Sequence, residues 1–301
     1  MALPVRLVGD KWLVRINVGS RGLDFILDSG DTAGITLQDS VLRSLGLKSY
    51  ASYSNGANAG RFLSREAIVP EMRVGDLTMH DVAITTLPAL GLEGGDFRAV
   101  GLLGFDFLAD VVAALDYQHG TATATLPEGF AAPSDPDTYA IPVRVGTQGP
   151  ITDVRVDGAL GEHFMIDTGG FGGVMFTDYF ARRYPEVVRR AIPVENRGYH
   201  FGGVGGGFEA KPYRFASVQI ANIDFQNFTA WQIVTRRAYA SDMDGTIGPD
   251  FLKYFTVSMD YGDSTFYLVP NDLGRRYMHA TVAKPKPAPL TTATPAAAPA
   301  K

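Results

Sequence analysis

The chain of 301 residues contains no cysteine, which excludes both a disulfide scaffold and a thiol nucleophile. It also lacks an apolar run long enough to cross a bilayer as a helix. Its 27 Lys and Arg residues are outnumbered by 32 Asp and Glu residues, and no basic block stands out. Nothing in this balance favours nucleic acid as a partner, because such partners call for a clustered basic face.

Several enzyme signatures are missing as well. The five His residues show no metal-ligand spacing, and no Gly-x-Ser-x-Gly elbow is present. The glycine run at 202–207 is not followed by Lys-Ser or Lys-Thr, which disfavours a phosphate loop. We therefore expect neither a metal nor an organic cofactor.

No secretory signal peptide is visible, because Met1–Pro4 leads almost directly into strand-like sequence. The compartment stays open, and a periplasmic or secreted location is favoured only if such a leader has been removed.

What the chain has in abundance is glycine, with 34 residues, together with 18 prolines and many short runs of Val, Ile, Phe and Tyr. This composition favours a mostly β fold with many turns. The length suggests about two domains. Trp12–Val18 and Leu23–Leu27 read as the two strands of a hairpin, with the turn at 19–22.

The chain repeats itself. Phe25–Gly30 reads Phe-Ile-Leu-Asp-Ser-Gly, and Phe164–Gly169, 139 residues later, reads Phe-Met-Ile-Asp-Thr-Gly. A second block, Gly101–Leu108, recurs as Gly245–Leu252 after a shift of 144 residues. Two separated motifs in the same order predict an internal duplication.

The duplication predicts three parts. Residues 1–132 form an N-terminal lobe, residues 137–278 form a C-terminal lobe, and a Pro/Ala-rich tail at 279–301 is expected to be disordered. The segment Ala131–Pro136 reads as the linker between the lobes. Strand-like residues Ala114–Tyr117 match Ser258–Tyr261, and their aspartates are expected in hairpin turns.

Each Asp-x-Gly motif places a carboxylate at the end of an apolar strand. Desolvation there raises the pKa of Asp28 and Asp167 unless hydrogen bonds offset it. A hydroxyl follows each, on Ser29 and Thr168, and then Gly30 or Gly169 allows a tight turn. Two such loops meeting about a pseudo-twofold axis bring the carboxylates together, where they share one proton and activate a water.

These motifs resemble the pepsin and retropepsin superfamily of aspartic peptidases, most closely its bacterial single-chain members with two retropepsin-like lobes. Asp28-Ser29-Gly30 and Asp167-Thr168-Gly169 match its signature. Leu102-Leu103-Gly104 and Thr246-Ile247-Gly248 match its second hallmark, an apolar pair before Gly. The resemblance covers nearly all of 5–270. It implies two closed-barrel-like β lobes, few short helices, a peptide or protein substrate, and a monomer as the active unit.

Family members also carry a glycine-rich β-hairpin flap that closes over the substrate. One candidate hairpin includes Tyr53, Gly56 and Gly60. The other candidate includes Tyr199, Gly203 and Gly205. Neither resembles a known flap tip closely, and which of them dominates stays open.

One position departs from the pepsin pattern. A Ser or Thr usually follows the signature Gly and favours activity at strongly acidic pH, but here Asp31 and Gly170 stand there. We therefore expect an optimum at mildly acidic to near-neutral pH. Asp106 and Asp250 are expected as N-caps of short helices. The alternative to an aspartic endopeptidase is a peptide-binding protein of the same fold with little or no turnover.

Overall fold

The predicted hairpin before the first motif is present. Strand β2 (Lys11–Val18) pairs antiparallel with β3 (Arg21–Leu27), from Leu13 opposite Ile26 to Val18 opposite Arg21. The last three residues of β3 are all buried, as expected of a strand covered on both faces. Asp28 follows directly, so the strand delivers its carboxyl to the interior of the molecule.

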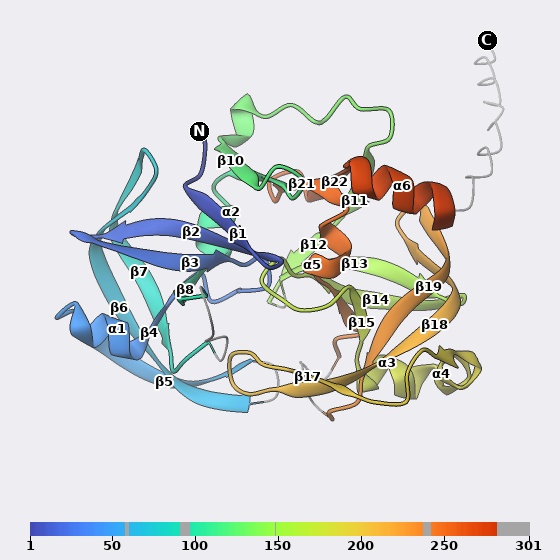
Figure 1. Ribbon diagram of the computed structural model, residues 1–301. Helices are drawn as coiled ribbons and strands as arrows, with labels where there is room; N and C mark the ends of the chain where they lie inside the picture. The colour runs from blue at the N-terminus through green and yellow to red at the C-terminus, as the bar shows by residue number, and fades with distance from the viewer. Residues whose placement is uncertain (58–59, 91–96, 148, 237–241, 282–301) are drawn as a thin grey trace, which may run out of the picture.

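The structure is a computed structural model that describes residues 1–57, 60–90, 97–147, 149–236 and 242–281. It is mostly β and has two lobes joined by a third sheet, which confirms the predicted fold class (Figure 1). In the described part of the chain, no helix has the length and apolar character needed to span a membrane.

The first lobe is built on an eight-stranded sheet in the order β1-β2-β3-β8-β4-β7-β6-β5. Strand β2 also pairs with β6, so the path from β2 through β8 and back to β6 closes on itself. The strands are β1 (Val5–Val8), β2, β3, β4 (Ile35–Gln38), β5 (Ser49–Ala57), β6 (Gly60–Val74), β7 (Leu77–Leu87) and β8 (Ala99–Leu103).

The second lobe repeats this strand order. Its nine-stranded sheet runs β12-β13-β14-β20-β15-β19-β18-β16, with β17 on β18, and β13 also pairs with β18. The same order in both lobes is what an internal duplication predicts. The strands are β12 (Arg144–Gly146), β13 (Gly149–Val156), β14 (Ala159–Ile166), β15 (Val174–Phe176), β16 (Ile192–Pro193), β17 (Tyr199–Phe201), β18 (Phe208–Ile220), β19 (Ile223–Ile233) and β20 (Gly245–Ile247).

A five-stranded sheet, β10-β9-β21-β22-β11, takes strands from both halves of the chain. Ala114 of β9 lies opposite Ser258 of β21, which is its counterpart at the 144-residue shift. The matched strands thus pair with each other, as expected where a pseudo-twofold axis passes between the lobes. The strands are β9 (Val112–Asp116), β10 (Thr121–Thr125), β11 (Tyr139–Pro142), β21 (Phe255–Asp260) and β22 (Thr265–Pro270).

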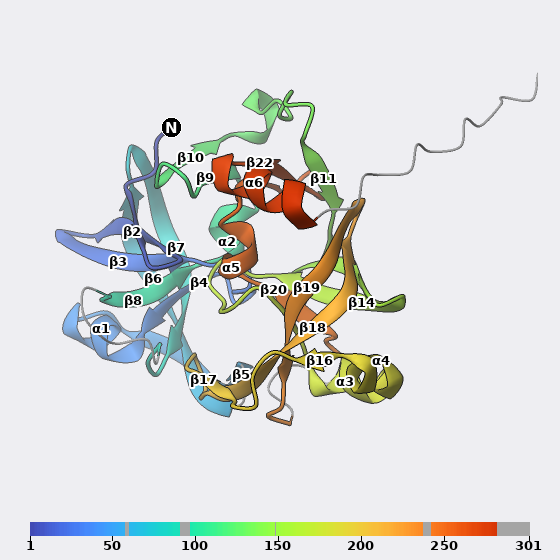
Figure 2. The same ribbon diagram turned by 45° about the vertical axis from the view of Figure 1, so that its right-hand side comes forward.

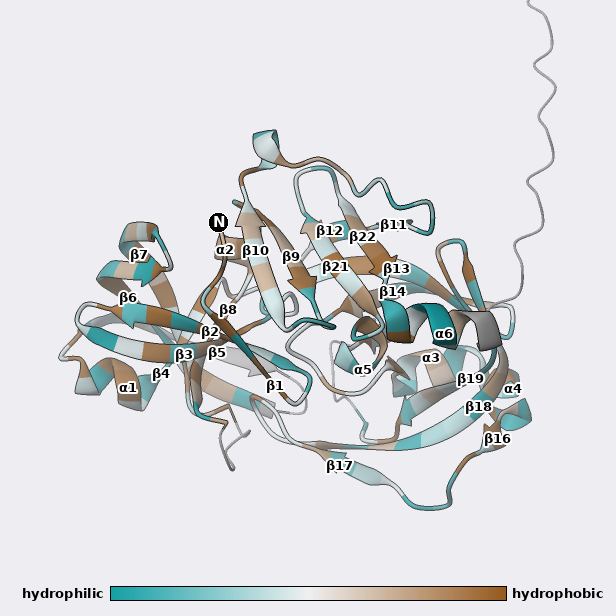
Figure 3. Cartoon of the chain, turned by 45° about the horizontal axis from the view of Figure 1, so that its top comes forward, coloured by the Kyte–Doolittle hydropathy of each residue, from teal (hydrophilic) through white to brown (hydrophobic). Residues whose placement is uncertain are grey.

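The helices are short; α1 and the α3–α4 pair lie on the outside of the two lobes, whereas α2 and α5 lie near the middle of the molecule (Figure 2). They are α1 (Asp39–Ser44), α2 (Phe105–Leu108), α3 (Asp178–Arg183), α4 (Pro185–Arg190), α5 (Pro249–Leu252) and α6 (Asp272–Thr281), with one 3-10 turn at Pro127–Gly129. Helix α6 is largely hydrophilic (Figure 3). It includes residues 279–281, which the sequence placed in the tail, and the remaining tail residues 282–301 lie outside the described residues.

The expected helix caps are wrong, whereas the expected turn aspartates are confirmed. Asp106 and Asp250 do not cap α2 and α5, because the N-cap positions are Gly104 and Gly248. Both aspartates lie in the first helical turn instead, where a negative charge suits the helix dipole. Asp116 and Asp260 do serve turns. Asp116 accepts hydrogen bonds from the N–H groups of residues 118 and 119, and Asp260 accepts one from residue 263.

Candidate active site

The two Asp-x-Gly motifs occupy equivalent places in the two lobes. Strand β3 runs parallel to β8 and pairs Leu27 with Leu103, while β14 runs parallel to β20 and pairs Ile166 with Ile247. The N–H of the following aspartate continues each ladder. Asp28 donates to the carbonyl of Leu103 at 3.1 Å, and Asp167 donates to the carbonyl of Ile247 at 2.9 Å.

The second hallmark glycine lies directly behind each loop. A Cβ atom on Gly104 would lie 2.4 Å from the carbonyl oxygen of Asp31, and one on Gly248 would lie 2.5 Å from that of Phe171. No larger residue fits without movement of the loop. The late Gly motif is therefore explained by close packing of two backbone segments.

Ser29 and Thr168 bind the two loops to each other. The N–H of each residue donates to the hydroxyl of the other at 3.0 Å. The Ser29 hydroxyl donates to the carbonyl of Ile166 at 2.7 Å, and the Thr168 hydroxyl donates to that of Leu27 at 2.8 Å. Both side chains are buried. The four hydrogen bonds cross between the lobes and fix the relative position of the loops.

The carboxyls of Asp28 and Asp167 meet between these loops and are hydrogen-bonded to each other. The N–H of Gly30 donates to Asp28 Oδ1 at 2.8 Å. Each glycine also lies against the aspartate of the other lobe. A Cβ on Gly30 would lie 2.8 Å from Asp167 Cγ, and one on Gly169 would lie 2.2 Å from Asp28 Cγ. Asp167 is 7% exposed, and Asp28 is half-buried.

The two carboxyls differ in their electrostatic surroundings. Burial raises the pKa of Asp28 well above its usual value, and the charges of Asp167 and Asp31 add to the rise. Burial also raises the pKa of Asp167, but the charge of Lys11, the hydrogen bond from Asp28 and the N–H groups of the next two glycines oppose it. The two carboxyls titrate as a coupled pair, in which the surroundings disfavour the charged form more strongly at Asp28 than at Asp167.

The comparisons with known proteins agree with this geometry. A family model described as aspartyl protease matches residues 13–107. The crystal structure of an aspartic proteinase from Irpex lacteus is similar with a TM-score of 0.52 and 14% identity, over 92% of this chain and 99% of that chain. A comparison with curated proteins finds no match.

Part of the first half of the chain is similar to aspartyl proteases, and the chain as a whole has the fold of an aspartic proteinase. The family match lies within the first lobe, and the structural likeness extends the same fold over both lobes. At this low identity the structural likeness concerns the fold. Together the two findings support a peptidase of the aspartic class.

The residues after the signature glycines differ between the two lobes. Burial raises the pKa of Asp31 to about 7, against hydrogen bonds from the Ala33 N–H and from Thr36. Its Oδ2 atom is buried and has no partner among the described residues. In the second lobe, a Cβ on Gly170 would lie 2.3 Å from Asp167 Oδ2, so a side chain is excluded and the backbone approaches the carboxyl instead.

Both flap candidates lie in β-hairpins that approach each other in Figures 1 and 2. Tyr53, Gly56 and Gly60 belong to the β5–β6 hairpin, whose tip at 58–59 lies outside the described residues. The Tyr53 hydroxyl is 3.3 Å from Thr85 Oγ1.

The second hairpin joins β17 to β18. Tyr199 packs edge-on against Trp231, while Gly203 and Gly205 form the connecting loop. Between these glycines, Val204 packs on an apolar cluster of the first lobe, which includes Leu13, Ile26, Leu87, Leu90, Ala99 and Leu102. This hairpin therefore bridges the two lobes.

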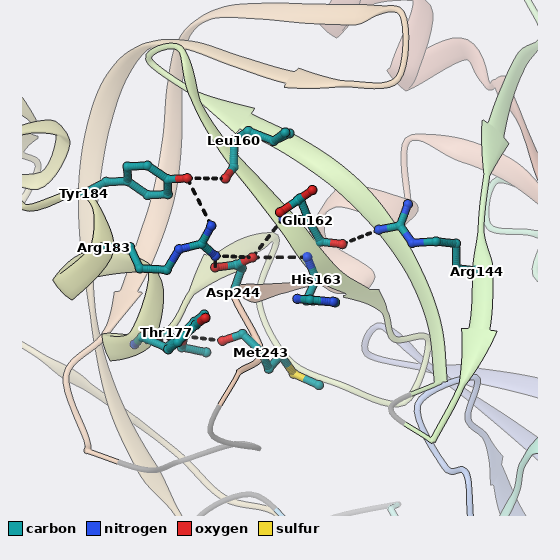
Figure 4. Close-up of polar contacts among 10 residues, drawn as sticks. Arg144, Leu160, Glu162, His163, Thr177, Arg183, Tyr184, Met243 and Asp244 are labelled. Atoms are coloured by element: carbon teal, nitrogen blue, oxygen red, sulfur yellow. Dashed lines mark hydrogen bonds and ion pairs between the residues drawn. The ribbon is translucent and has the colours of Figure 1, made fainter.

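A buried charge network supports the strand that carries Asp167 (Figure 4). Asp244 has a fully buried side chain and lies just before β20. Its Oδ2 accepts hydrogen bonds from the N–H groups of Glu162 and His163 of β14, at 2.8 and 3.2 Å. Arg183 Nη1 of α3 lies 2.9 Å from Oδ1. The network ties β14, β20 and α3 together.

One residue near the pair of Asp28 and Asp167 was not predicted from the sequence. Lys11 is only 9% exposed, and its charge acts on both Asp167 and Asp28. The internal repeat gave no clue to it, because the equivalent position in the second lobe holds Gly149. In the described residues, no cluster of three or more His, Asp or Glu side chains is arranged to hold a metal ion.

Proposed function

We propose that this protein is an aspartic endopeptidase that hydrolyses peptide bonds with Asp28 and Asp167. The observation that carries the proposal is the hydrogen-bonded pair of carboxyls, held by loops that are locked to each other by Ser29 and Thr168. Such a pair holds one proton and one charge, which is the state needed to activate a water molecule.

In this mechanism the ionised Asp167 takes a proton from a water molecule as the water attacks the carbonyl carbon of the peptide. Asp28 supplies a hydrogen bond to the carbonyl oxygen, where negative charge develops. Collapse of the tetrahedral intermediate breaks the C–N bond, and a proton from the pair passes to the leaving nitrogen. Since both carboxyls come from one chain, the monomer is the active unit.

The substrate is a peptide or protein segment in extended form. Such a segment is bound by strand-like backbone hydrogen bonds, with side-chain contacts giving selectivity. The two hairpins that hold Tyr53, Gly56 and Gly60 and Tyr199, Gly203 and Gly205 are the candidates for flaps over it. The bridging contact of Val204 with the first lobe favours the second hairpin.

The working pH is mildly acidic to near-neutral. No hydroxyl follows the signature glycine in either lobe, and the only side chain at that position, on Asp31, is itself an acid whose pKa lies near 7. The ionised Asp31 opposes ionisation of Asp28, so the pair keeps its shared proton toward neutral pH.

The test is cleavage of a mixed peptide library across pH, followed by mass spectrometry, with Asp28→Asn and Asp167→Asn beside the wild-type protein. We expect cleavage by the wild-type protein and losses of at least about 1000-fold in both variants, since each removes half of the acid–base pair. Cleavage that survives both substitutions overturns the mechanism. Peptide binding without cleavage at any pH favours a non-catalytic peptide-binding protein.

A further inference from the structure

Lys11 is a buried cation that reaches from the first lobe to the second. It begins β2, where it lies opposite Val8. Its Nζ atom lies 4.5 Å from the centroid of the Phe171 ring, on the second catalytic loop. Phe171 follows Asp167 by four residues. The side chain therefore ends beside the loop that holds Asp167.

A lysine buried to this extent requires compensation, because removal from water disfavours its charge. Burial does lower the pKa of Lys11, and the charge of Asp167 opposes this most, followed by those of Asp28, Asp10 and Asp250. Two of these carboxylates have another cation, since Lys253 Nζ lies 2.7 Å from Asp250 and 3.9 Å from Asp10. The negative charge of the Asp28–Asp167 pair is therefore the charge that compensates the buried cation of Lys11.

The fold itself does not need a cation at this position. The equivalent residue of the second lobe is Gly149, which lies opposite Gly146 as Lys11 lies opposite Val8, and it has no side chain. The lobes thus present different electrostatic surroundings to a pair of carboxyls that is otherwise nearly symmetric. Both charged groups belong to the first lobe. The charge of Asp31 acts on Asp28, whereas the charge of Lys11 acts most strongly on Asp167.

We propose that Lys11 is a positioning residue that holds the single negative charge of the pair on Asp167 and leaves the proton on Asp28. The inference rests on the proposed function, in which Asp167 is then the base and Asp28 the acid. Lys11 acts through charge and does not contact the reacting atoms.

The remaining titratable groups that face the pair do not substitute for Lys11. The hydroxyls of Tyr117 and Tyr261 are buried without partners among the described residues, and burial raises the pKa of both, so they stay neutral. Asp31 is an acid and cannot supply a positive charge, and the same holds for Asp106, whose charge acts on Asp31. Among the described groups named here, Lys11 is thus the one whose positive charge acts on the pair.

The test is a pH titration of the carboxyl carbons in protein labelled with ¹³C at aspartate. Signals of Asp28 and Asp167 are assigned by their loss in Asp28→Asn and Asp167→Asn. In Lys11→Met, which keeps the apolar stem, we expect the lower apparent pKa of the pair to rise by roughly one unit. Lys11→Arg keeps the charge and should titrate like the wild-type protein.

Lys253→Met is the matched control, because it removes a nearby cation that pairs with Asp10 and Asp250. It should leave the titration of Asp28 and Asp167 in place. Lys11→Gln repeats the measurement if Lys11→Met does not fold. An unchanged lower pKa in Lys11→Met or Lys11→Gln overturns the inference, whatever the cleavage rates of these variants.

The same variants separate this inference from the proposed function. If the wild-type protein cleaves peptides, the acid limb of its kcat/KM profile should move toward higher pH in Lys11→Met by the same amount as the titration. If the wild-type protein cleaves nothing, the proposed function fails, and the titration still decides whether Lys11 sets the charge of the pair.

Discussion

Ser29 and Thr168 exchange hydrogen bonds across the boundary between the lobes, each N–H donating to the other's hydroxyl at 3.0 Å. Each hydroxyl then donates to the carbonyl at the end of the opposite lobe's strand. The residue after each aspartate therefore serves the other lobe. Neither Asp-x-Gly loop can be positioned independently of the other.

Thr168→Val tests this relationship by replacing the hydroxyl with a methyl group of similar size. It leaves the N–H of Ser29 and the carbonyl of Leu27 buried and unpaired. We expect a loss of roughly 2–4 kcal/mol in the free energy of unfolding, since each unpaired buried group costs about 1–3 kcal/mol. Urea denaturation measures it. Thr168→Ser keeps the hydroxyl and is the control, and equal stability of the two variants contradicts the prediction.

Sequence reasoning located the two aspartates and the hydroxyl residues because each motif is local and occurs twice. It could not show that Ser29 and Thr168 bind each other's loops, because that depends on how the lobes are placed. For the same reason it matched Ala114 with Ser258 but could not show that they lie opposite each other in one sheet. Lys11 was missed because its contact with Phe171 joins residues 160 positions apart that share no motif.

Gly169→Ala should abolish peptide cleavage while the fold is kept. Its Cβ would lie 2.2 Å from Asp28 Cγ, so the carboxyl must move away from Asp167. We expect at least about 100-fold loss in kcat/KM, as displacements near 1 Å can cause this. Gly146→Ala is the control, since a Cβ there meets nothing within 4 Å. Wild-type cleavage rates in Gly169→Ala would show that the pair tolerates displacement.

Asp31→Asn should change the pH dependence of stability. The pKa of Asp31 is raised to about 7 in the folded protein, from an ordinary value of 3.8. The folded state therefore prefers the protonated form, and the stability that this form gives is complete below about pH 4 and lost as the pH rises to about 7. Asn is neutral throughout, so the variant should be more stable above pH 7, by at most about 4 kcal/mol.

Thermal unfolding of Asp31→Asn and the wild-type protein at pH 4 and pH 8 checks this sign. The stabilities should agree at the acidic pH and diverge at the alkaline pH. The exposed Asp76, changed to Asn, is the control and should show no such divergence. A stability gain that is equal at both pH values would mean that the charge of Asp31 is not its cause.

Asp31→Asn should also narrow the pH range over which the protein cleaves peptides. The charge of Asp31 raises the pKa of Asp28. Without that charge, Asp28 loses its proton at lower pH, and the alkaline limb of kcat/KM should move toward acid. The acid limb should stay in place, because Asp31 is already protonated there. A shift of the acid limb alone is the contrary result.

Asp244 is the charged residue whose loss should cost the most stability. Its side chain is fully buried, and it accepts hydrogen bonds from two N–H groups of β14 and from Arg183 (Figure 4). Asp244→Ala leaves these donors unpaired, so we expect a loss of about 3–5 kcal/mol.

Asp153→Ala is the matched control for Asp244→Ala. It breaks an ion pair with Arg144 at 2.7 Å, but half of the Asp153 side chain is exposed to water (50%). Such a pair contributes only about 0–1 kcal/mol. Because β14 ends at Ile166, directly before Asp167, the loss of Asp244 should also reduce peptide cleavage, whereas the loss of Asp153 should not. Equal effects of the two substitutions on urea denaturation would mean that burial of the Asp244 network does not stabilise β14, the strand that leads into the Asp167 loop.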